Sequence, residues 1–243
     1  MIHFLKKQFG HIVPTASLFK GMVDVHSHVL FGTDDGADTL EESLQILRAM
    51  SACGLKGVFC TPHVMETVSA EEMENRQPHF DRLIAEAKDI MDIRLAAEYM
   101  LEKDFETKIN QNPATFDGKH ILIEMSYLSG SPKLFETVYE IQIKDYIPVL
   151  AHPERYLYLP STKLETLIER GCLLQLNLPS LIGLYGKRVQ ERASRWLLNG
   201  KYTFVGSDTH SPRGWDLIAS SYIEKEKIAP LKRLIENNQI LWP

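Results

Sequence analysis

The sequence predicts an α/β fold in which seven parallel strands and the helices between them form a (β/α)7 barrel. Short apolar runs, typical of strands buried on both faces of a sheet, alternate along the chain with segments of helical pattern. Histidines and carboxylates stand at the ends of six of these runs. Because the carboxyl ends of parallel strands lie on one face of a barrel, these polar side chains are expected to meet there.

The individual elements follow from local patterns, although periodicity alone also permits an open sheet. Thr39 and Ser69 are each followed three residues later by glutamate, the spacing of a helix capping box. Ser131 precedes Pro132, which suits an N-cap followed by proline at the first helical position. We expect strands at 22–28, 57–61, 93–98, 120–125, 147–151, 173–177 and 203–207, and helices at 40–53, 70–90, 132–144, 162–170 and 186–199.

Length and composition predict a single catalytic domain over residues 22–243. The chain has 243 residues, of which 44% are hydrophobic and 24% charged, and no low-complexity segment marks a linker. Residues 1–21 form an N-terminal extension that mixes apolar residues with lysines. We expect it to pack along the outside of the barrel before the first strand, and binding to a membrane surface or a partner is the alternative.

Charge and cysteine content narrow the class of protein further. The net charge of −5 argues against a nucleic-acid-binding role based on phosphate neutralisation. The three cysteines, Cys53, Cys60 and Cys172, lack Cys-x-x-Cys spacing, so a reducing, cytoplasmic compartment is expected. No apolar run reaches the roughly 18 residues of a transmembrane helix, and the start of the chain lacks a signal-peptide core.

The segment His26-Ser27-His28 gives the clearest chemical signal. It ends the first apolar run, and residues i and i+2 of a strand point to the same side, so both imidazoles can reach one metal ion. An isolated pair of this kind is more often two structural histidines. Repetition of metal-binding residue types at the ends of five further runs favours the metal site.

Five histidines and four carboxylates make up the expected metal-ligand set. This number exceeds what one tetrahedral zinc ion takes and suits about two or three divalent ions. Such ions polarise a phosphoryl or acyl oxygen, so hydrolysis by a metal-activated hydroxide is the expected reaction. The nine residues are His26, His28, Asp35, His63, Glu98, Glu124, His152, Asp208 and His210.

Two arginines follow expected ligands at the same distance along the chain. Arg155 lies three residues after His152, and Arg213 lies three residues after His210. Guanidinium groups match phosphate oxygens in a bidentate fork and stabilise charge on a phosphoryl group in transfer. Both arginines are therefore candidate substrate-binding and catalytic residues, and solvated loop arginines are the alternative.

Seven short motifs occur in a fixed order along the chain. They are His26-Ser27-His28, Asp34-Asp35-Gly36, Thr61-Pro62-His63, Ala97-Glu98-Tyr99, Ile123-Glu124-Met125, Ala151-His152-Pro153-Glu154-Arg155-Tyr156 and Ser207-Asp208-Thr209-His210. In this order they resemble the motifs of the polymerase and histidinol phosphatase (PHP) superfamily. Within it the chain resembles the bacterial capsule and exopolysaccharide protein-tyrosine phosphatases of CpsB/YwqE type, over roughly residues 22–215.

The resemblance implies a distorted (β/α)7 barrel and an enzyme that removes phosphate from phosphotyrosine. The implied substrate is the tail of a bacterial tyrosine kinase that controls polysaccharide export, which would place the enzyme in the cytoplasm near the inner face of the membrane. Manganese is the implied metal, and iron, zinc or magnesium suit the same ligands. The resemblance places His26, His28, Glu98 and Asp208 on a first ion, Glu98, Glu124 and His152 on a second, and Asp35, His63 and His210 on a third.

Other functions stay open at this point. A small-molecule phosphatase such as a histidinol-phosphate phosphatase would use similar metals, although the Asp34-Asp35-Gly36 motif favours the tyrosine phosphatases. A non-catalytic metal-binding regulator of a kinase is expected to have lost ligands, and none is lost. An amidohydrolase is expected to carry a carboxylated lysine where Glu98 stands. A cysteine-based phosphatase is excluded, because no cysteine begins a Cys-x5-Arg loop.

Three residues beside the expected ligands have open roles. Asp34, Tyr99 and Tyr127 could orient water or stack on the substrate ring, or they could cap a turn and fill the core. The sequence is compatible with a homo-oligomer but specifies none.

Overall fold

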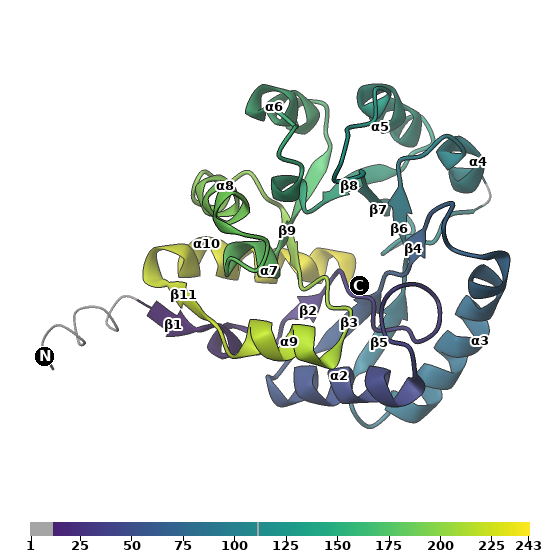
Figure 1. Cartoon of the computed structure of the whole chain (residues 1–243), viewed down its shortest axis with the longest axis vertical. Coiled ribbons are helices and arrows are strands. Elements are labelled where there is room, and N and C mark those ends of the chain that lie inside the picture. Colours follow the sequence, from purple (N-terminus) through teal and green to yellow (C-terminus); the bar gives the residue numbers. More distant parts are fainter. Residues whose placement is uncertain (1–11, 111) are drawn as a thin grey trace, which may run out of the picture.

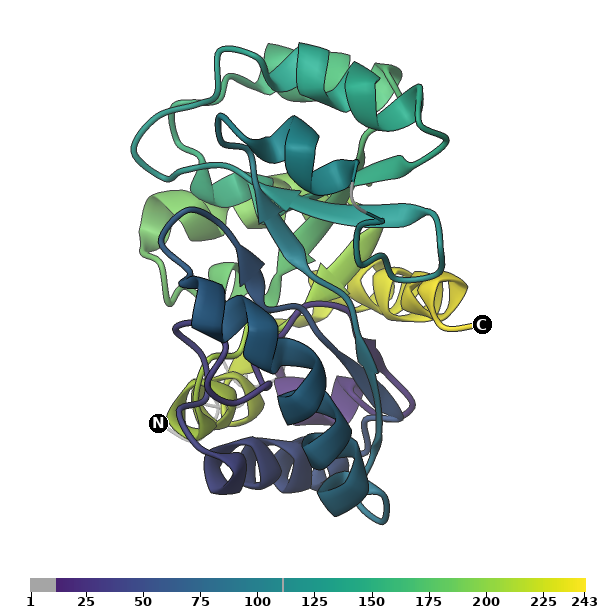
Figure 2. The ribbon, with the colours of Figure 1, turned by 90° about the vertical axis from the view of Figure 1, so that its right-hand side faces the viewer.

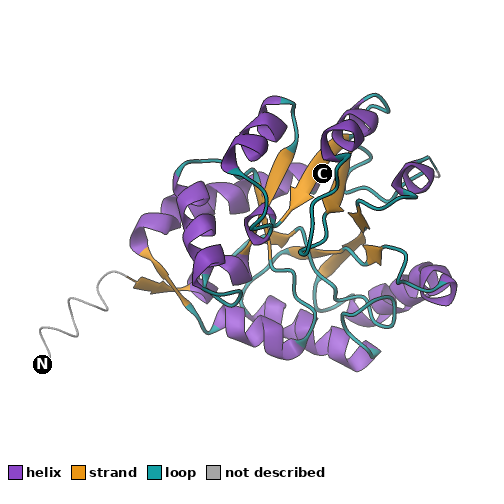
Figure 3. Cartoon of the chain, turned by 45° about the horizontal axis from the view of Figure 1, so that its top comes forward, coloured by secondary structure: helices purple, strands orange, loops and turns teal. Residues whose placement is uncertain are grey.

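The strands lie at the centre of the molecule and the helices surround them (Figures 1 and 3). The computed structural model describes residues 12–110 and 112–243. Figure 2 shows the helices of the first part of the chain (purple to blue) at one end of the molecule and those of the middle part (teal to green) at the other. The expected alternation of strand and helix is confirmed.

The central strands form two parallel sheets. Six strands pair in the order β10-β9-β8-β7-β6-β4, and three pair in the order β2-β3-β5. All of these pairs are parallel. The strands are β2 (Val23–Asp24), β3 (Gly57–Cys60), β4 (His63–Val64), β5 (Asp92–Leu95), β6 (Glu98–Met100), β7 (His120–Glu124), β8 (Ile147–Ala151), β9 (Leu173–Asn177) and β10 (Phe204–Gly206).

Two neighbouring strands of the barrel are interrupted, and these breaks divide the barrel into the two sheets. The strand expected at 93–98 is split into β5 and β6, which belong to different sheets, so that prediction was wrong in its continuity. Its neighbour is interrupted in the same place, between β3 and β4, where Pro62 has no N–H to donate. Hydrogen bonds still cross the gap, from the N–H of Ala96 to Cys60 O (2.9 Å) and from the N–H of Glu98 to Pro62 O (3.2 Å).

The first and last strands of the ring meet after their regular parts end. Ser27 and Thr209 form a parallel bridge. The N–H of His28 donates to Thr209 O at 2.9 Å, and the N–H of Asp208 donates to His26 O at 2.7 Å. These contacts connect the segment after β2 to the segment after β10, which confirms the predicted distorted (β/α)7 barrel.

Helices occupy the expected places, and the described residues contain four α-helices that were not expected. The five predicted helices correspond to α2, α3, α5, α6 and α8, while α4, α7, α9 and α10 were not predicted. The helices are α2 (Leu40–Ala52), α3 (Ala70–Ala87), α4 (Phe105–Ile109), α5 (Leu134–Gln142), α6 (Ser161–Glu169), α7 (Leu178–Leu181), α8 (Lys187–Leu198), α9 (Pro212–Ala219) and α10 (Lys225–Asn237).

Two of the three predicted helix starts are confirmed. The Thr39 hydroxyl accepts the N–H of Glu42, and Ser69 forms a complete capping box with Glu72. Ser131 does not cap α5, which begins at Leu134, because the Ser131 hydroxyl instead accepts the N–H of Lys133 in a preceding turn. Helix α3 ends at residue 87 rather than at the expected 90.

An apolar plug fills the amino-terminal end of the barrel. The ring of Phe59 packs edge to face against Phe116, with centroids 4.9 Å apart, and against Trp242, at 5.0 Å. Trp242 follows the last short helix, η3 (Asn238–Leu241), and lies against Gly57 at the start of β3. Aromatic side chains therefore fill this end of the barrel, and the expected ligands lie at the other end.

The described part of the N-terminal extension packs against the C-terminal region. Strand β1 (Ile12–Pro14) pairs antiparallel with β11 (Tyr222–Glu224), and the buried Phe19 ring lies 5.4 Å from the Trp215 ring of α9. Residues 1–11, for which the sequence leaves a membrane-surface or partner role open, lie outside the described residues. No helix within the described residues has both the length and the apolar character needed to cross a membrane.

Candidate metal centre

All nine expected ligands meet at one end of the barrel, where the chain leaves β2, β3, β5, β7, β8 and β10. Glu98 lies at the centre of the group. Its Oε2 is 3.2 Å from Nε2 of His26, 3.5 Å from Nε2 of His28 and 3.1 Å from Nδ1 of His63. Its Oε1 is 3.0 Å from Nε2 of His152. A carboxylate whose two oxygens face different imidazoles can bridge two ions.

The outer part of the cluster is more open to solvent. Oδ1 of Asp35 is 3.4 Å from Nε2 of His63 and 3.4 Å from Nε2 of His210. The His210 ring also stacks on the His28 ring, with centroids 4.0 Å apart. The Asp35 side chain is 71% exposed, whereas Glu98 is fully buried. The cluster thus runs from a buried centre to a rim that a substrate can approach.

Glycines allow the loops to approach the ligands closely. A side chain at Gly206 would meet Cβ of His26 at 2.5 Å, and one at Gly36 would meet the carbonyl oxygen of His28 at 2.1 Å. His152 and Asp208 have positive backbone φ angles of 34° and 52°. Non-glycine residues seldom adopt this conformation, and its presence at two expected ligands is typical of a functional site.

Each inner imidazole has one nitrogen fixed by the protein and the other directed into the cluster. Nδ1 of His26 is 3.0 Å from Oε1 of Gln175, and Nδ1 of His28 is 2.7 Å from Oδ2 of Asp34. Nδ1 of His152 is 3.1 Å from the hydroxyl of Tyr156. Such partners orient the ring of a metal-binding histidine and leave the Nε2 lone pair for the ion.

The inner atoms fit a cation better than they fit one another. Nε2 of His26 and Nε2 of His28 are only 3.2 Å apart. Nδ1 of His63, Oε2 of Glu98 and Oε1 of Glu124 are buried without a hydrogen-bond partner among the described residues. Leaving buried polar atoms unpaired is costly. Divalent ions would satisfy these nitrogen and oxygen atoms together, so the residues present fit the expected metals.

The pKa values of the expected ligands also reflect the close approach of their side chains. Burial and the neighbouring His28 act to lower the pKa of His63, but the carboxylates of Glu124 and Glu98 outweigh them and raise it to about 10. Burial and the like charge of Glu98 raise the pKa of Glu124 to about 7. Burial lowers the pKa of His152 to about 4. Protons on His63 and Glu124 therefore offset charge that metal ions would otherwise balance.

The grouping of the candidate ligands overlaps with the grouping that the resemblance implies but matches none of its three sets in full. Nε2 of His152 is 3.0 Å from Oε1 of Glu98 but 4.0 Å from Oε2 of Glu124. Glu124 lies nearer to His63, at 2.9 Å from Nδ1. The sets of ligand atoms close enough to share an ion are His28, Asp35, His63 and His210; His26, His28 and Asp208; His26, Glu98 and His152; and His63, Glu98 and Glu124.

Asp34 holds the cluster together from outside. It accepts the N–H of His63 at 2.9 Å as well as binding His28. Its pKa lies well below the usual value, because His28 and the His63 N–H outweigh the effect of burial. Asp34 also accepts the N–H of Gly36 at 2.9 Å, which confirms that it caps the turn, and its contacts with two expected ligands are a further role.

Two of the three residues that support the ligands, Gln175 and Asn177, carried no signal in the sequence. The Gln175 Oε1 atom, which contacts His26, also accepts the N–H of His152 at 3.3 Å. Asn177 donates to Oδ2 of Asp208 at 2.7 Å. Both residues belong to β9, the strand that ends in no expected ligand. The Tyr156 hydroxyl, besides its contact with His152, accepts the N–H of Met125 at 3.0 Å. Only the position of β9 between β8 and β10 reveals the roles of Gln175 and Asn177.

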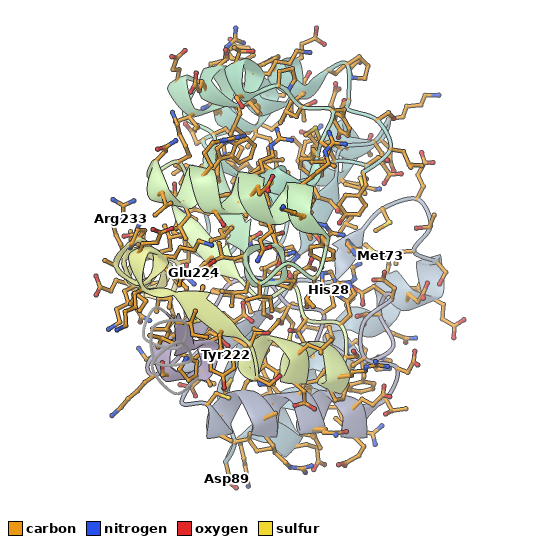
Figure 4. The ribbon with its side chains drawn as sticks, turned by 60° about the vertical axis from the view of Figure 1, so that its left-hand side comes forward. His28, Met73, Asp89, Tyr222, Glu224 and Arg233 are labelled. Atoms are coloured by element: carbon orange, nitrogen blue, oxygen red, sulfur yellow. The ribbon has the colours of Figure 1, made fainter. Side chains whose placement is uncertain are left out.

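The two arginines differ in their surroundings. Arg155 donates to Oδ2 of Asp208 at 2.9 Å, at the edge of the cluster. Arg213 lies in the first turn of α9 and is exposed, and within residues 12–110 and 112–243 its side chain makes no hydrogen bond or ion pair. In Figure 4, His28 lies inside the molecule, whereas Met73 and Arg233 lie at its surface.

A cavity of about 590 Å³ lies among the loops beside the cluster. Its walls include Met65, Met100 and Ser126, each two residues beyond an expected ligand. The walls also carry the charged side chains of Lys133 and Glu140. None of the nine expected ligands lines this cavity, so it adjoins the cluster only through residues that follow the ligands along the chain.

Comparison with known proteins identifies the family. The model of the capsular polysaccharide synthesis family CpsB/CapC matches residues 22–217. The chain belongs to the CpsB/CapC family. The tyrosine-protein phosphatase YwqE of Bacillus subtilis is 32% identical over 233 residues, which cover 89% of each protein. The tyrosine-protein phosphatase CpsB of Streptococcus pneumoniae is 28% identical over 225 residues, which cover 84% of this chain and 93% of that protein.

Solved structures agree with this assignment to the CpsB/CapC family. A chain from the crystal structures of YwqE and CpsB, described as unique metal-dependent tyrosine phosphatases, superposes with a TM-score of 0.77 at 26% identity and covers 90% of this chain and 94% of that one. Histidinol phosphate phosphatase from Lactococcus lactis gives a TM-score of 0.54 at 18% identity, over 89% of this chain and 93% of that one. The second likeness concerns the fold alone, and the resemblance predicted from the motifs is confirmed.

Proposed function

We propose that this protein is a metal-dependent protein-tyrosine phosphatase, a phosphoric monoester hydrolase that acts on phosphotyrosine in a protein. Membership of the CpsB/CapC family supports this, and so do the names of its relatives. The observation that carries the proposal is the position of Arg155, whose guanidinium touches the Asp208 carboxylate at the edge of the ligand cluster. There a phosphate group can be bound by the cluster and the arginine together.

The nine ligands are proposed to hold two or three divalent ions, with manganese the leading choice. When bound, such ions polarise the phosphoryl group and make a water molecule acidic enough to attack it near neutral pH. Oδ1 of Asp208 faces Nε2 of His26 at 3.5 Å and Nε2 of His28 at 3.4 Å. Because its Oδ2 is bonded to Asn177 and Arg155, this carboxylate keeps Oδ1 directed into the cluster.

The arginines are proposed to bind the phosphate of the substrate. The N–H groups of Arg155 that do not contact Asp208 can donate to phosphoryl oxygens and stabilise their charge during transfer. Arg213 is proposed to approach from α9 when substrate is bound, since it follows His210 by three residues. The leaving phenolate has a pKa of about 10, so it needs little help from a general acid.

The cavity beside the cluster supports a protein substrate over a small one. Its apolar walls, which include Met65, Met100 and Phe105, suit a peptide segment on either side of the phosphotyrosine. We propose a bacterial tyrosine kinase as the natural partner, as the resemblance implies. With such a partner, the reaction is proposed to take place in the cytoplasm, close to the membrane.

Phosphate release from two substrates tests the proposal. The manganese-loaded protein is given a tyrosine-phosphorylated peptide and histidinol phosphate side by side, with and without a chelator. Faster, chelator-sensitive release from the peptide supports the proposed function. Faster release from histidinol phosphate would assign the protein to the small-molecule phosphatases, and turnover of neither substrate would favour the non-catalytic regulator.

A further inference from the structure

Arg155 lies between two tyrosine rings at the edge of the ligand cluster. Its guanidinium carbon is 4.0 Å from the ring centre of Tyr127 and 4.0 Å from that of Tyr185. Tyr127 belongs to the loop after β7, and Tyr185 to the loop between α7 and α8. A guanidinium between two aromatic faces is attracted by both and is confined to one plane. We call Tyr127, Arg155 and Tyr185 the tyrosine–arginine stack.

The stack leaves part of the guanidinium free. One nitrogen, Nη1, donates to Oδ2 of Asp208 at 2.9 Å, and the Tyr185 hydroxyl reaches the same oxygen at 3.4 Å. Among the described residues the Arg155 side chain makes no other hydrogen bond, and 17% of it is exposed. The remaining N–H groups are therefore available to a phosphate oxygen at the cluster, while the rings fix the plane in which they lie.

The stack is supported from behind by the residue that orients a ligand. The ring of Tyr127 stacks on Tyr156, with centroids 6.0 Å apart and planes inclined by 24°. Tyr156 is fully buried and binds Nδ1 of His152 through its hydroxyl. One continuous set of contacts thus positions both a metal ligand and the free arginine.

We propose that Tyr127 and Tyr185 are positioning residues that hold Arg155 ready to bind the phosphate group of the substrate. An unrestrained arginine loses side-chain freedom when it binds phosphate, and this loss weakens binding. The stack removes that freedom before substrate arrives. This inference rests on the proposed function, because it assigns the arginine to the phosphate of that substrate.

The proposal is tested by leucine substitutions that remove each ring and by phenylalanine substitutions that keep it. Binding of inorganic phosphate to the metal-loaded protein is measured by calorimetry for Tyr127→Leu, Tyr185→Leu and the two Phe variants. Each Leu variant is expected to weaken binding roughly three- to tenfold, and each Phe variant to bind nearly as the unchanged protein does. Tyr139→Leu is the control, since Tyr139 is 63% exposed on α5.

A second background shows whether the tyrosines act through the arginine. In an Arg155→Ala protein, Tyr127→Leu and Tyr185→Leu are expected to have no further effect on phosphate binding. The same loss in both backgrounds would overturn the proposal. Metal content and thermal unfolding of every variant are measured as well, and a loss of phosphate binding that follows lost metal would also overturn it.

Comparison of two ligands distinguishes positioning from direct contact with the substrate ring. If the tyrosines only hold Arg155, phosphate and a phosphotyrosine-like peptide with a non-hydrolysable phosphonate group are expected to lose affinity by the same factor. A much larger loss for the peptide would contradict the proposal, because it would place the rings against the phenol. Phosphate binding requires no turnover, so this result is independent of whether the protein proves to be a tyrosine phosphatase.

Discussion

The two ends of the barrel are built on opposite principles. At the amino-terminal end, Phe59, Phe116 and Trp242 pack edge to face and bury apolar ring surface against one another. At the carboxyl-terminal end, nine ligand side chains face one another, and Glu98 and Glu124 have buried oxygens without partners among the described residues. The comparison shows that one end stabilises the fold and the other uses part of that stability to hold a reactive arrangement.

The size of each contribution supports this division. A buried phenylalanine side chain contributes about 1.5–3 kcal/mol through removal of apolar surface from water. Each buried polar atom left without a partner costs about 1–3 kcal/mol. The ligand end is therefore expected to destabilise the metal-free protein and to stabilise the metal-loaded one. Substitutions at the two ends should separate activity from stability.

The largest effect is expected at the ligand end. His152→Ala and Asp208→Ala each remove one donor from the cluster, so both variants should lose metal and lose at least about a thousandfold in kcat/KM. Metal content and peptide turnover check this. Asp89→Ala, which changes an exposed carboxylate at the molecular surface (Figure 4), is the control. Full turnover by a metal-depleted His152→Ala protein would contradict the metal mechanism.

The next effect is expected at the apolar end. Phe59→Ala should lower the free energy of unfolding by about 3–5 kcal/mol, because it leaves a cavity against Phe116 and Trp242. Denaturant unfolding of the metal-loaded protein measures this change. The folded fraction should bind the same number of metal ions as the unchanged protein. A changed metal count would show that the two ends are not separable.

A smaller effect is expected from the residue that orients two ligands. Asp34→Ala removes the acceptor of His28 Nδ1 and of the His63 N–H, so metal affinity should fall about 10- to 100-fold. Competition with a chelator of known affinity measures the change. Asp38→Ala is a suitable control, since Asp38 is exposed in the same loop. An unchanged affinity would mean that Asp34 serves only the turn.

The smallest effect concerns pH. The pKa of His63 is raised to about 10 in the metal-free protein, so this imidazole is protonated at neutral pH and must release its proton when metal binds. Metal affinity should therefore rise with pH, by up to about tenfold per pH unit for each proton released. Calorimetry in buffers of different ionisation enthalpy counts these protons. Affinity that does not change between about pH 6 and 8 would contradict the protonated state.

Sequence reasoning predicted the fold and the cluster of candidate ligands because both follow from local patterns. Eight of the nine expected ligands follow one of six apolar runs, as His152 does after β8, and a parallel barrel brings the ends of such runs together. The break between β5 and β6 was missed, because residues 93–98 have the pattern of one continuous strand and the partner with Pro62 lies elsewhere in the chain. The register in which two distant strands pair cannot be predicted from the sequence of one strand alone.

The residues that orient the ligands could not be found in the same way. Gln175 and Asn177 are polar residues within the otherwise apolar strand β9. Only the order of the strands in the sheet places them beside His26 and Asp208. Tyr185 lies in a loop with no motif, and it acquires its contact with Arg155 only through the packing of α7 and α8. Contacts between residues distant in sequence therefore required the structure.

The most direct test of the contrast between the two ends is a metal titration of the metal-free protein with activity and stability followed together. We predict that turnover of a phosphotyrosine peptide appears only after about two or three equivalents of manganese have bound, and that the midpoint of thermal unfolding rises over the same range. Full turnover without metal, or a midpoint that does not respond to it, would contradict the account of a ligand end held in place for metal ions.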